Sequence, residues 1–156
     1  MFYKLCVLLG NYLPPKLNML FYKLGGVKLG IKNCWIGNKC YLDTQFPDLI
    51  EIKKNVCISA NVFLIAHFDP TMANKKHLIK KYKKKIIINE GVFIGPNSMI
   101  MPGVTLGKNV FVKAGTVISK SIPDNLVVEG NPHKILFKMD EKHSNLINSI
   151  NKNNLF

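Results

Sequence analysis

The chain of 156 residues contains no arginine, and all 22 of its basic residues are lysines. Arginine supplies the planar fork that reads guanine edges and binds phosphate through two parallel hydrogen bonds, whereas lysine is a point charge. The composition therefore disfavours sequence-specific reading of nucleic acid, and we expect no nucleic-acid partner. The net charge of +13 still favours anionic partners such as phosphorylated cofactors, anionic lipids or polyanionic glycans.

Cysteine pairs and long apolar runs are also scarce. The four cysteines form no C-x-x-C pair and have no histidines at metal-binding spacing, so no structural zinc site is expected. Reduced thiols are typical of a cytoplasmic protein. The apolar stretch 5–9 is too short for a membrane span or a signal peptide. With 47% hydrophobic and 20% charged residues, the chain has the length and composition of one cytoplasmic domain.

An aliphatic residue recurs every six positions over much of the chain. The repeat runs from Ile88 to Ile118, a second register of small or β-branched residues runs from Val92 to Ile122, and both reappear upstream within 36–64. Six residues of an α-helix rotate by about 600°, which moves each apolar position off its stripe. The pattern instead predicts short strands joined by turns, three to a coil of roughly 18 residues. The expected fold class is all-β, a parallel β-helix.

Two interruptions and two terminal segments surround the repeat. Residues 43–51 exceed one repeat and predict a small loop, whereas residues 70–85 abandon the pattern, are rich in lysine, and predict an exposed excursion loop. Residues 1–24 predict a helical N-terminal cap of two short amphipathic helices over the open edge of the coil. The β-helical domain is expected over 25–138, and a short C-terminal helix or tail over 139–156.

The stretch 87–135 resembles the hexapeptide-repeat acyltransferases, which include galactoside, maltose, serine and polysaccharide O-acetyltransferases. It reads IINEGVFIGPNSMIMPGVTLGKNVFVKAGTVISKSIPDNLVVEGNPHKI and follows the family's succession of IG, PGVTIG, AG(S/T)V and GNPAK motifs. The resemblance implies a left-handed coil and acetyl-CoA as the acyl donor. It also implies a homotrimer whose active sites lie between neighbouring subunits.

Acyl transfer from a thioester to a sugar hydroxyl needs a general base within hydrogen-bond reach of that hydroxyl. Among four histidines, His67 in LIAHFDP ends a repeat just before the excursion, where the family's catalytic histidine precedes its loop. We predict His67 as the base. Asp69, two residues further on, is predicted to orient the imidazole and to stabilise its charged form. Aspartate before proline is also a common turn former, so the turn reading of Asp69 stays open.

The resemblance further implies a cofactor edge of small residues, which let the pantetheine arm approach the backbone. Phe93 replaces the family's tryptophan and is expected to flank that arm. Pro96 has no N–H, so Gly95 or an amide of a neighbouring subunit is expected to stabilise the oxyanion. The predicted cofactor-binding residues are Phe93, Gly95, Ala114, Gly115, Thr116, Lys120 and Lys134, the two lysines lying near the adenosine phosphates. Turn geometry and solvated charge account for the small residues and the lysines equally well.

Polar residues Asp43, Asp48 and Asn61 are the candidate acceptor-binding residues, although turn formation explains the aspartates just as well. The expected function is acetyl transfer from acetyl-CoA to a hydroxyl of a sugar in a surface polysaccharide, namely capsule, O-antigen or exopolysaccharide. The alternatives are transfer to an amino sugar, serine or chloramphenicol, and a non-catalytic β-helical scaffold. No bound metal is expected. The N-terminal segment and the lysine-rich excursion favour peripheral association with the inner face of a membrane.

Overall fold

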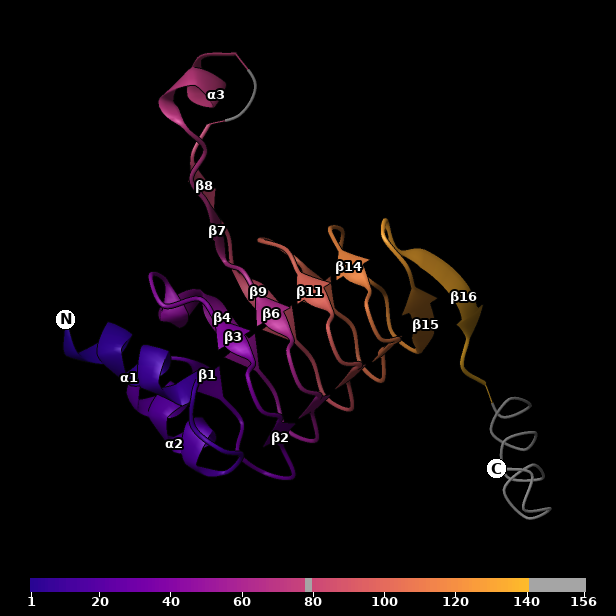
Figure 1. Cartoon of the computed structure of the whole chain (residues 1–156). Helices are drawn as coiled ribbons and strands as arrows, with labels where there is room; N and C mark the ends of the chain where they lie inside the picture. The colour runs from indigo at the N-terminus through magenta and orange to yellow at the C-terminus, as the bar shows by residue number, and fades with distance from the viewer. Residues whose placement is uncertain (78–79, 141–156) are drawn as a thin grey trace.

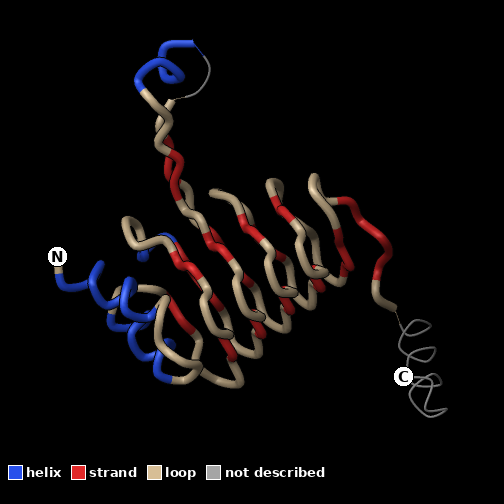
Figure 2. The backbone as a smooth tube through the Cα atoms, viewed as in Figure 1, coloured by secondary structure: helices blue, strands red, loops and turns tan. Residues whose placement is uncertain are grey.

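The computed structural model describes residues 1–77 and 80–140. From residue 28 the chain winds into a coil with three short strands per turn, so that stacked strands build a three-sided prism (Figures 1 and 2). We call the sides A, B and C in the order in which the chain visits them. Stacked strands of successive coils are parallel on every side. The prediction of a parallel β-helix is therefore confirmed.

Each side is a sheet of very short strands. Side A contains β1 (Lys28–Leu29), β4 (Ile50–Ile52), β9 (Ile86–Ile88) and β12 (Thr105–Leu106). Side B contains β2 (Trp35–Ile36), β5 (Cys57–Ile58), β10 (Phe93–Ile94), β13 (Phe111–Val112), β15 (Leu126–Glu129) and β16 (Lys134–Lys138). Side C contains β3 (Tyr41–Leu42), β6 (Phe63–Leu64), β11 (Met99–Ile100) and β14 (Val117–Ile118).

Both six-residue registers point into the prism. The first contributes the buried residues Ile36, Leu42, Ile52, Ile58, Leu64, Ile88, Ile94, Ile100, Leu106, Val112 and Ile118. The second contributes Val56, Val62, Val92, Ser98, Val104, Val110, Thr116 and Ile122. The register pairs Ile94 with Val112 and Ile100 with Ile118, which confirms the predicted stacking of one coil on the next. Each such burial contributes about 1.5–3 kcal/mol, so this column is the main source of stability.

Corners between the sides hold most of the residues discussed below. The B–C corner comprises 37–40, 59–62, 95–98 and 113–116. The C–A corner comprises 43–49, 65–85, 101–104 and 119–121. At the B–C corner Asn61, Asn97 and Gly115 have positive φ values of 57°, 58° and 69°, a conformation that asparagine and glycine tolerate best. The predicted turns thus lie where the sixfold pattern requires them.

The N-terminal end of the coil exposes carbonyl groups that no strand pairs. Each coil donates its N–H groups to the carbonyls of the next coil, as Gly37 N does to Ile58 O at 2.8 Å. Carbonyls of the first coil therefore accept from elsewhere. Asn18 Nδ2 donates to Ile36 O at 3.0 Å, and Tyr22 Oη donates to Cys40 O at 3.3 Å.

Both donors belong to α2 (Leu17–Leu24), which lies with α1 (Phe2–Gly10) across this end of the prism (Figure 1). Asn11, which follows α1, donates to Leu42 O at 3.4 Å and accepts from Leu42 N at 3.0 Å. Because an unpaired strand edge is a template for aggregation, the helices protect the first coil by hydrogen-bonding its edge.

The C–A corner carries both interruptions of the repeat. Residues 43–51 contain the 3-10 helix η1 (Pro47–Leu49) and the start of β4. The excursion begins earlier than predicted, with the antiparallel pair β7 (His67–Phe68) and β8 (Tyr82–Lys83), and it carries α3 (Met72–His77). It projects away from the prism (Figures 1 and 2).

The other end of the coil is covered by β16, which runs antiparallel to β15. Most of the C-terminal helix or tail predicted over 139–156 lies outside the described residues. Within the ranges that the structure describes, no helix has the length and apolar character that crossing a membrane requires.

Candidate active site

His67 lies at the foot of the excursion and contacts a buried carboxylate from another coil. Its Nδ1 atom lies against Oδ2 of Asp43, which is fully buried just after β3. The same Oδ2 accepts the Ala66 N–H at 2.9 Å. Oδ1 accepts the N–H groups of Gln45 at 2.9 Å and Phe46 at 3.3 Å. Three backbone donors therefore fix the carboxylate that holds the imidazole.

This contact determines which nitrogen of His67 can act as a base. A carboxylate only accepts hydrogen bonds, so Nδ1 carries the proton and Nε2 keeps its lone pair. The His67 side chain is 16% exposed, and the ring of Phe46 packs edge-on with centroids 5.4 Å apart. The imidazole is thus oriented by one neighbour and packed by another, with Nε2 left to take a proton from a bound hydroxyl.

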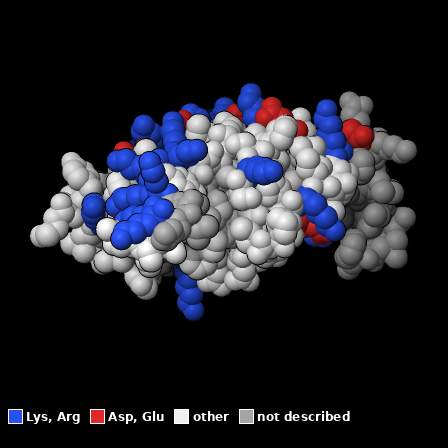
Figure 3. Space-filling view, turned by 90° about the horizontal axis from the view of Figure 1, so that it is seen from above, with Lys and Arg blue, Asp and Glu red and all other residues white. Residues whose placement is uncertain are grey.

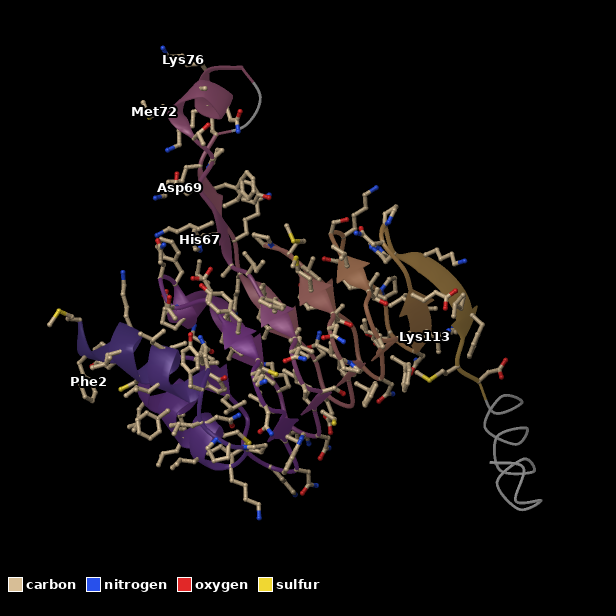
Figure 4. All side chains as sticks on the ribbon, viewed as in Figure 1. Phe2, His67, Asp69, Met72, Lys76 and Lys113 are labelled. Atoms are coloured by element: carbon tan, nitrogen blue, oxygen red, sulfur yellow. The ribbon has the colours of Figure 1, made fainter. Side chains whose placement is uncertain are left out.

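The prediction for Asp69 differs from the structure. Asp69 lies further out on the excursion than His67 (Figure 4), where its carboxylate accepts from Lys75 Nζ and Lys81 Nζ, each at 2.8 Å. Hydrogen bonds from these two lysines lower its pKa to about 2. Asp69 therefore forms ion pairs within the excursion. The role predicted for Asp69, orienting the imidazole of His67, belongs to Asp43.

The predicted acceptor-binding residues are also separated. Asp43 is buried behind His67 and has no surface to offer a sugar, so that prediction is wrong. Asp48 is exposed in η1 and lines a hollow of about 360 Å³ with Tyr3 and Lys4. Asn61 lies at the B–C corner, where its positive φ serves the turn. Of the three, the structure brings only Asp43 into contact with His67.

Two of the predicted cofactor-binding residues, Thr116 and Gly95, use their polar groups in hydrogen bonds within the coil. Thr116 is buried, and its hydroxyl donates to Lys113 O at 2.7 Å and accepts from Gly130 N at 3.2 Å. Gly95 is buried beneath the next coil, and its N–H donates to Val112 O at 2.8 Å. The side chain of Thr116 therefore cannot reach a ligand, and the Gly95 N–H cannot be the oxyanion donor.

The remaining predicted cofactor residues are accessible. Ala114 and Gly115 are exposed at the B–C corner. Phe93 is half-buried on side B, where it stacks on Phe111 with centroids 4.6 Å apart. Lys120 is exposed at the C–A corner, and Lys134 on β16 lies 3.4 Å from Glu129. These residues could still line a ligand from outside the prism.

Sequence reasoning missed two backbone donors beside Pro96. Ala60 precedes Pro96 by one coil at this corner, since Asn97 N donates to Ala60 O at 3.2 Å. Ala114 follows it by one coil, since Gly115 N donates to Pro96 O at 2.8 Å. Neither the Ala60 N–H nor the Ala114 N–H has a protein acceptor within the described part of the chain. The sixfold register alone was sufficient to find both positions.

His67 and this corner do not meet within one chain. His67 follows β6 at the C–A corner, whereas Ala114 and Gly115 precede β14 at the B–C corner. The two groups therefore lie at opposite ends of the strands of side C. A site that uses both is incomplete in a single copy.

A hollow of about 870 Å³ lies elsewhere, along side A. Its lining mixes Lys28, Lys53 and Lys108 with Glu51 and Glu90. Its lining contains no histidine that could serve as an oriented base. Across residues 1–77 and 80–140, no three His, Cys, Asp or Glu side chains gather as metal ligands would.

The family description "Bacterial transferase hexapeptide (six repeats)" matches residues 85–120. The Bacillus subtilis (strain 168) protein YvoF, provisionally named an acetyltransferase, is 35% identical over 105 residues, covering 67% of this chain and 56% of YvoF. A galactoside O-acetyltransferase of Lactococcus lactis (strain IL1403) is 32% identical over 116 residues, covering 72% of this chain and 56% of that protein. The chain thus spans little more than half the length of these relatives.

A solved structure of a galactoside acetyltransferase in complex with coenzyme A has the same fold. It aligns with a TM-score of 0.63 and 24% identity, covering 91% of this chain and 81% of that chain. The likeness and the matched repeat agree with the residues that carried the resemblance in the sequence. The chain belongs to the hexapeptide-repeat family of left-handed parallel β-helix proteins, which includes galactoside O-acetyltransferases.

Proposed function

We propose that this protein is an acetyl-CoA-dependent O-acetyltransferase that uses His67 as the general base toward a sugar hydroxyl. The observation that carries the proposal is the buried Asp43 carboxylate, which three backbone N–H groups fix against Nδ1 of His67. A scaffold has no use for an imidazole held in one tautomer. The galactoside O-acetyltransferase relative supports a sugar acceptor, and the coenzyme A complex of the solved neighbour supports the acyl donor.

In the proposed reaction, Nε2 of His67 takes the hydroxyl proton as the sugar oxygen attacks the thioester carbonyl. Asp43 stabilises the imidazolium that results. Ala60 N–H or Ala114 N–H, which flank Pro96, stabilises the oxyanion. Collapse of the tetrahedral intermediate breaks the carbon–sulfur bond, and the imidazolium returns its proton to the departing coenzyme A thiolate.

The proposed assembly is a homotrimer with sites between subunits. Outward-facing residues on side B include Trp35 and Phe111, which are 45% and 38% exposed, and side C presents Phe63 at 39%. Side A presents Lys28 and Glu51 instead. Apolar outer faces gain stability when copies bury them against each other. Such packing also gives His67 of one copy access to the B–C corner of another, which one chain alone does not provide.

The proposed acceptor is a sugar of a surface polysaccharide, modified in the cytoplasm. Lysines gather on the face of the molecule shown in Figure 3, and beside His67 the Nζ of Lys83 lies 4.5 Å from the centroid of the Phe46 ring. Lys83 has no carboxylate partner in the described ranges. A cation next to the base favours an acceptor that carries negative charge, as activated sugars and many polysaccharides do.

The test measures coenzyme A release from acetyl-CoA with a panel of galactosides, maltose, amino sugars and nucleotide sugars. His67→Ala should lower kcat by about 10²–10⁴-fold and leave the KM for acetyl-CoA unchanged. Lys76→Ala, on the excursion away from His67, is the matched control and should retain wild-type turnover. Equal turnover in wild type and His67→Ala would end the assignment of the base. Turnover with amino sugars alone would replace O-transfer by N-transfer.

A further inference from the structure

The two N-terminal helices carry apolar residues on their outer faces as well as on the faces that they bury. Their inner faces bury Val7, Met19 and Tyr22. Asn11, which follows α1, and Asn18 of α2 are 6% and 1% exposed and bond the edge of the first coil. Their outer faces are apolar, with exposed fractions between 43% and 64%, for Phe2, Leu5, Leu9, Leu17, Leu20 and Leu24. Helices on the surface of a globular protein normally place such residues toward the core.

The spacing of these residues makes each outer face continuous. Phe2, Leu5 and Leu9 share one stripe of α1, and Leu17, Leu20 and Leu24 share one stripe of α2, at intervals of three and four residues. Figure 4 shows Phe2 directed away from the coil. An exposed apolar area of this kind marks a surface that another phase or molecule covers.

The charge of the N-terminal end indicates whether a second copy of the chain or an anionic partner binds this apolar surface. The first 42 residues contain six lysines and no aspartate or glutamate, the first acidic residue being Asp43. Three of the lysines, Lys4, Lys16 and Lys23, are exposed on or beside the helices. Two copies that met through this end would bring like charges together, which opposes self-association. A partner surface with negative charge would be attracted by the same lysines.

The surface between the helices and the first coil contains an apolar hollow edged with charge. Its volume is about 320 Å³, and its lining combines Met19, Leu20 and Ile31 with Lys16 and Lys23. Apolar side chains flanked by lysines are the composition of helices that lie in the interface of an anionic bilayer, where the lysines meet headgroup phosphates.

We propose that the outer face of α1 and α2 docks on the surface of an anionic lipid bilayer. The apolar stripes enter the headgroup region, and Lys4, Lys16 and Lys23 pair with lipid phosphates. The coil then points away from the membrane, with its first turn nearest the lipid. No membrane span is needed for this association.

Docking has a consequence that rests on the proposed function. Asp43 and His67 belong to the first and second coils, and stacked strands lie about 5 Å apart. The base would therefore work close to the headgroups, where a sugar carried on a lipid phosphate is presented. If the chain also forms the proposed trimer, three such faces lie on one end of the assembly, and their combined avidity strengthens weak individual contacts.

The experiment is sedimentation of the full chain with vesicles of phosphatidylcholine, with or without phosphatidylglycerol. We expect binding only to the anionic vesicles and release at high salt. The triple variant Lys4→Gln, Lys16→Gln and Lys23→Gln should bind about 100-fold more weakly. Its charge-matched control is Lys76→Gln, Lys80→Gln and Lys84→Gln on the excursion, which should bind as wild type. A control that loses as much binding as the test variant would move the contact to the excursion and overturn the proposal.

A second test variant, with its control, measures what the apolar residues contribute to vesicle binding. Leu9→Ser with Leu20→Ser should weaken vesicle binding by about 10-fold or more, whereas Ile135→Ser with Leu136→Ser, exposed on β16 at the other end of the coil, should not. Circular dichroism establishes that each variant is folded. A lower oligomeric mass of Leu9→Ser with Leu20→Ser would identify the face as a contact between copies and overturn docking on lipid.

An assay of acetyl transfer to a soluble sugar tests the proposed function independently of membrane docking. The helix variants should turn over at the wild-type rate, because neither helix touches His67. Absence of turnover in the wild type would count against the enzyme while leaving vesicle binding intact. Failure of the wild type to sediment with anionic vesicles at low salt would overturn docking alone.

Discussion

His67 and Asp43 lie 24 positions apart in the sequence, and their side chains are in contact through Nδ1 and Oδ2. Asp43 directly follows the third strand of the first coil, and His67 follows the third strand of the second coil. These two strands pair through Tyr41 with Phe63 and Leu42 with Leu64. The stacking that builds the hydrophobic column therefore also places the carboxylate against the imidazole. Stability and the proposed chemistry depend on the same register.

Replacing this carboxylate tests its positioning role. In Asp43→Asn the amide can present a donor to Nδ1, which favours the tautomer with the proton on Nε2 and removes the base. We expect kcat to fall by about 10²-fold or more, with the KM for acetyl-CoA unchanged. The measurement is kcat and KM across pH, because a variant that is only less stable would keep the wild-type profile.

Asp69→Asn is the matched control for that variant. The same isosteric change there removes partners of Lys75 and Lys81 on an exposed excursion and leaves the His67 contact intact. We expect kcat within about threefold of wild type, as for a surface ion pair of small energetic value. Loss of activity in Asp69→Asn together with retention in Asp43→Asn would reverse the assignment made from the structure.

The two glycines of the proposed cofactor edge should respond differently to substitution. A Cβ at Gly95 would lie 2.6 Å from Ala114 N, against the backbone of the next coil. Gly95→Ala should therefore destabilise the fold by about 2 kcal/mol or more, by forcing overpacking. Gly115 has a φ of +69° with nothing within 4 Å of an added Cβ, so Gly115→Asn should cost under about 1 kcal/mol. Thermal and urea unfolding of both variants measures the difference, and equal destabilisation would contradict it.

The six-residue period was sufficient to predict the strands, the parallel pairing and the interior. Residues such as Ile94 and Val112 repeat because every corner consumes the same number of residues, so local spacing dictates which positions stack. Where a corner lengthens, the period no longer determines the structure. The repeat predicts the excursion only as a break. It does not predict the pairing of β7 with β8 or the helix α3, since neither follows the sixfold pattern.

The site was predictable in part for the same reason. His67 could be identified because it ends a repeat, but its partner depends on how two lengthened corners superpose at 43–49 and 65–85. Proximity in sequence alone favours Asp69 as that partner. Lysines across the hairpin, at 75 and 81, instead bind its carboxylate. The prediction for Gly95 failed because the ladder between coils already uses its N–H group.

The lowered pKa of Glu51 predicts how the free energy of unfolding changes at acidic pH. Hydrogen bonds from Lys53 and then Lys85 lower its pKa from 4.5 to about 2. The unfolded chain therefore binds a proton at higher pH than the folded chain, so this stabilisation is present above about pH 4.5 and is lost as the pH falls toward 2. Glu51→Gln should lower stability by about 1 kcal/mol at neutral pH and flatten this part of the curve. Urea unfolding between pH 7 and pH 2 measures this dependence, and a Glu51→Gln curve with the wild-type slope would contradict the prediction.

The outward aromatic stack on side B predicts the effect of charge on assembly. Phe93 and Phe111 are stacked at 4.6 Å, with Phe111 38% exposed, although neither contributes to the interior column. If copies bury side B against one another, Phe111→Lys places a charge in an apolar contact and should dissociate the trimer to monomers, because an unpaired buried charge costs several kcal/mol. Light scattering after size exclusion measures the mass, and Lys28→Glu on side A is the control that should leave it unchanged. Dissociated Phe111→Lys should also lose acetyl transfer, since one copy holds His67 and the B–C corner at opposite ends of side C. An active monomer would show that a single chain completes the site.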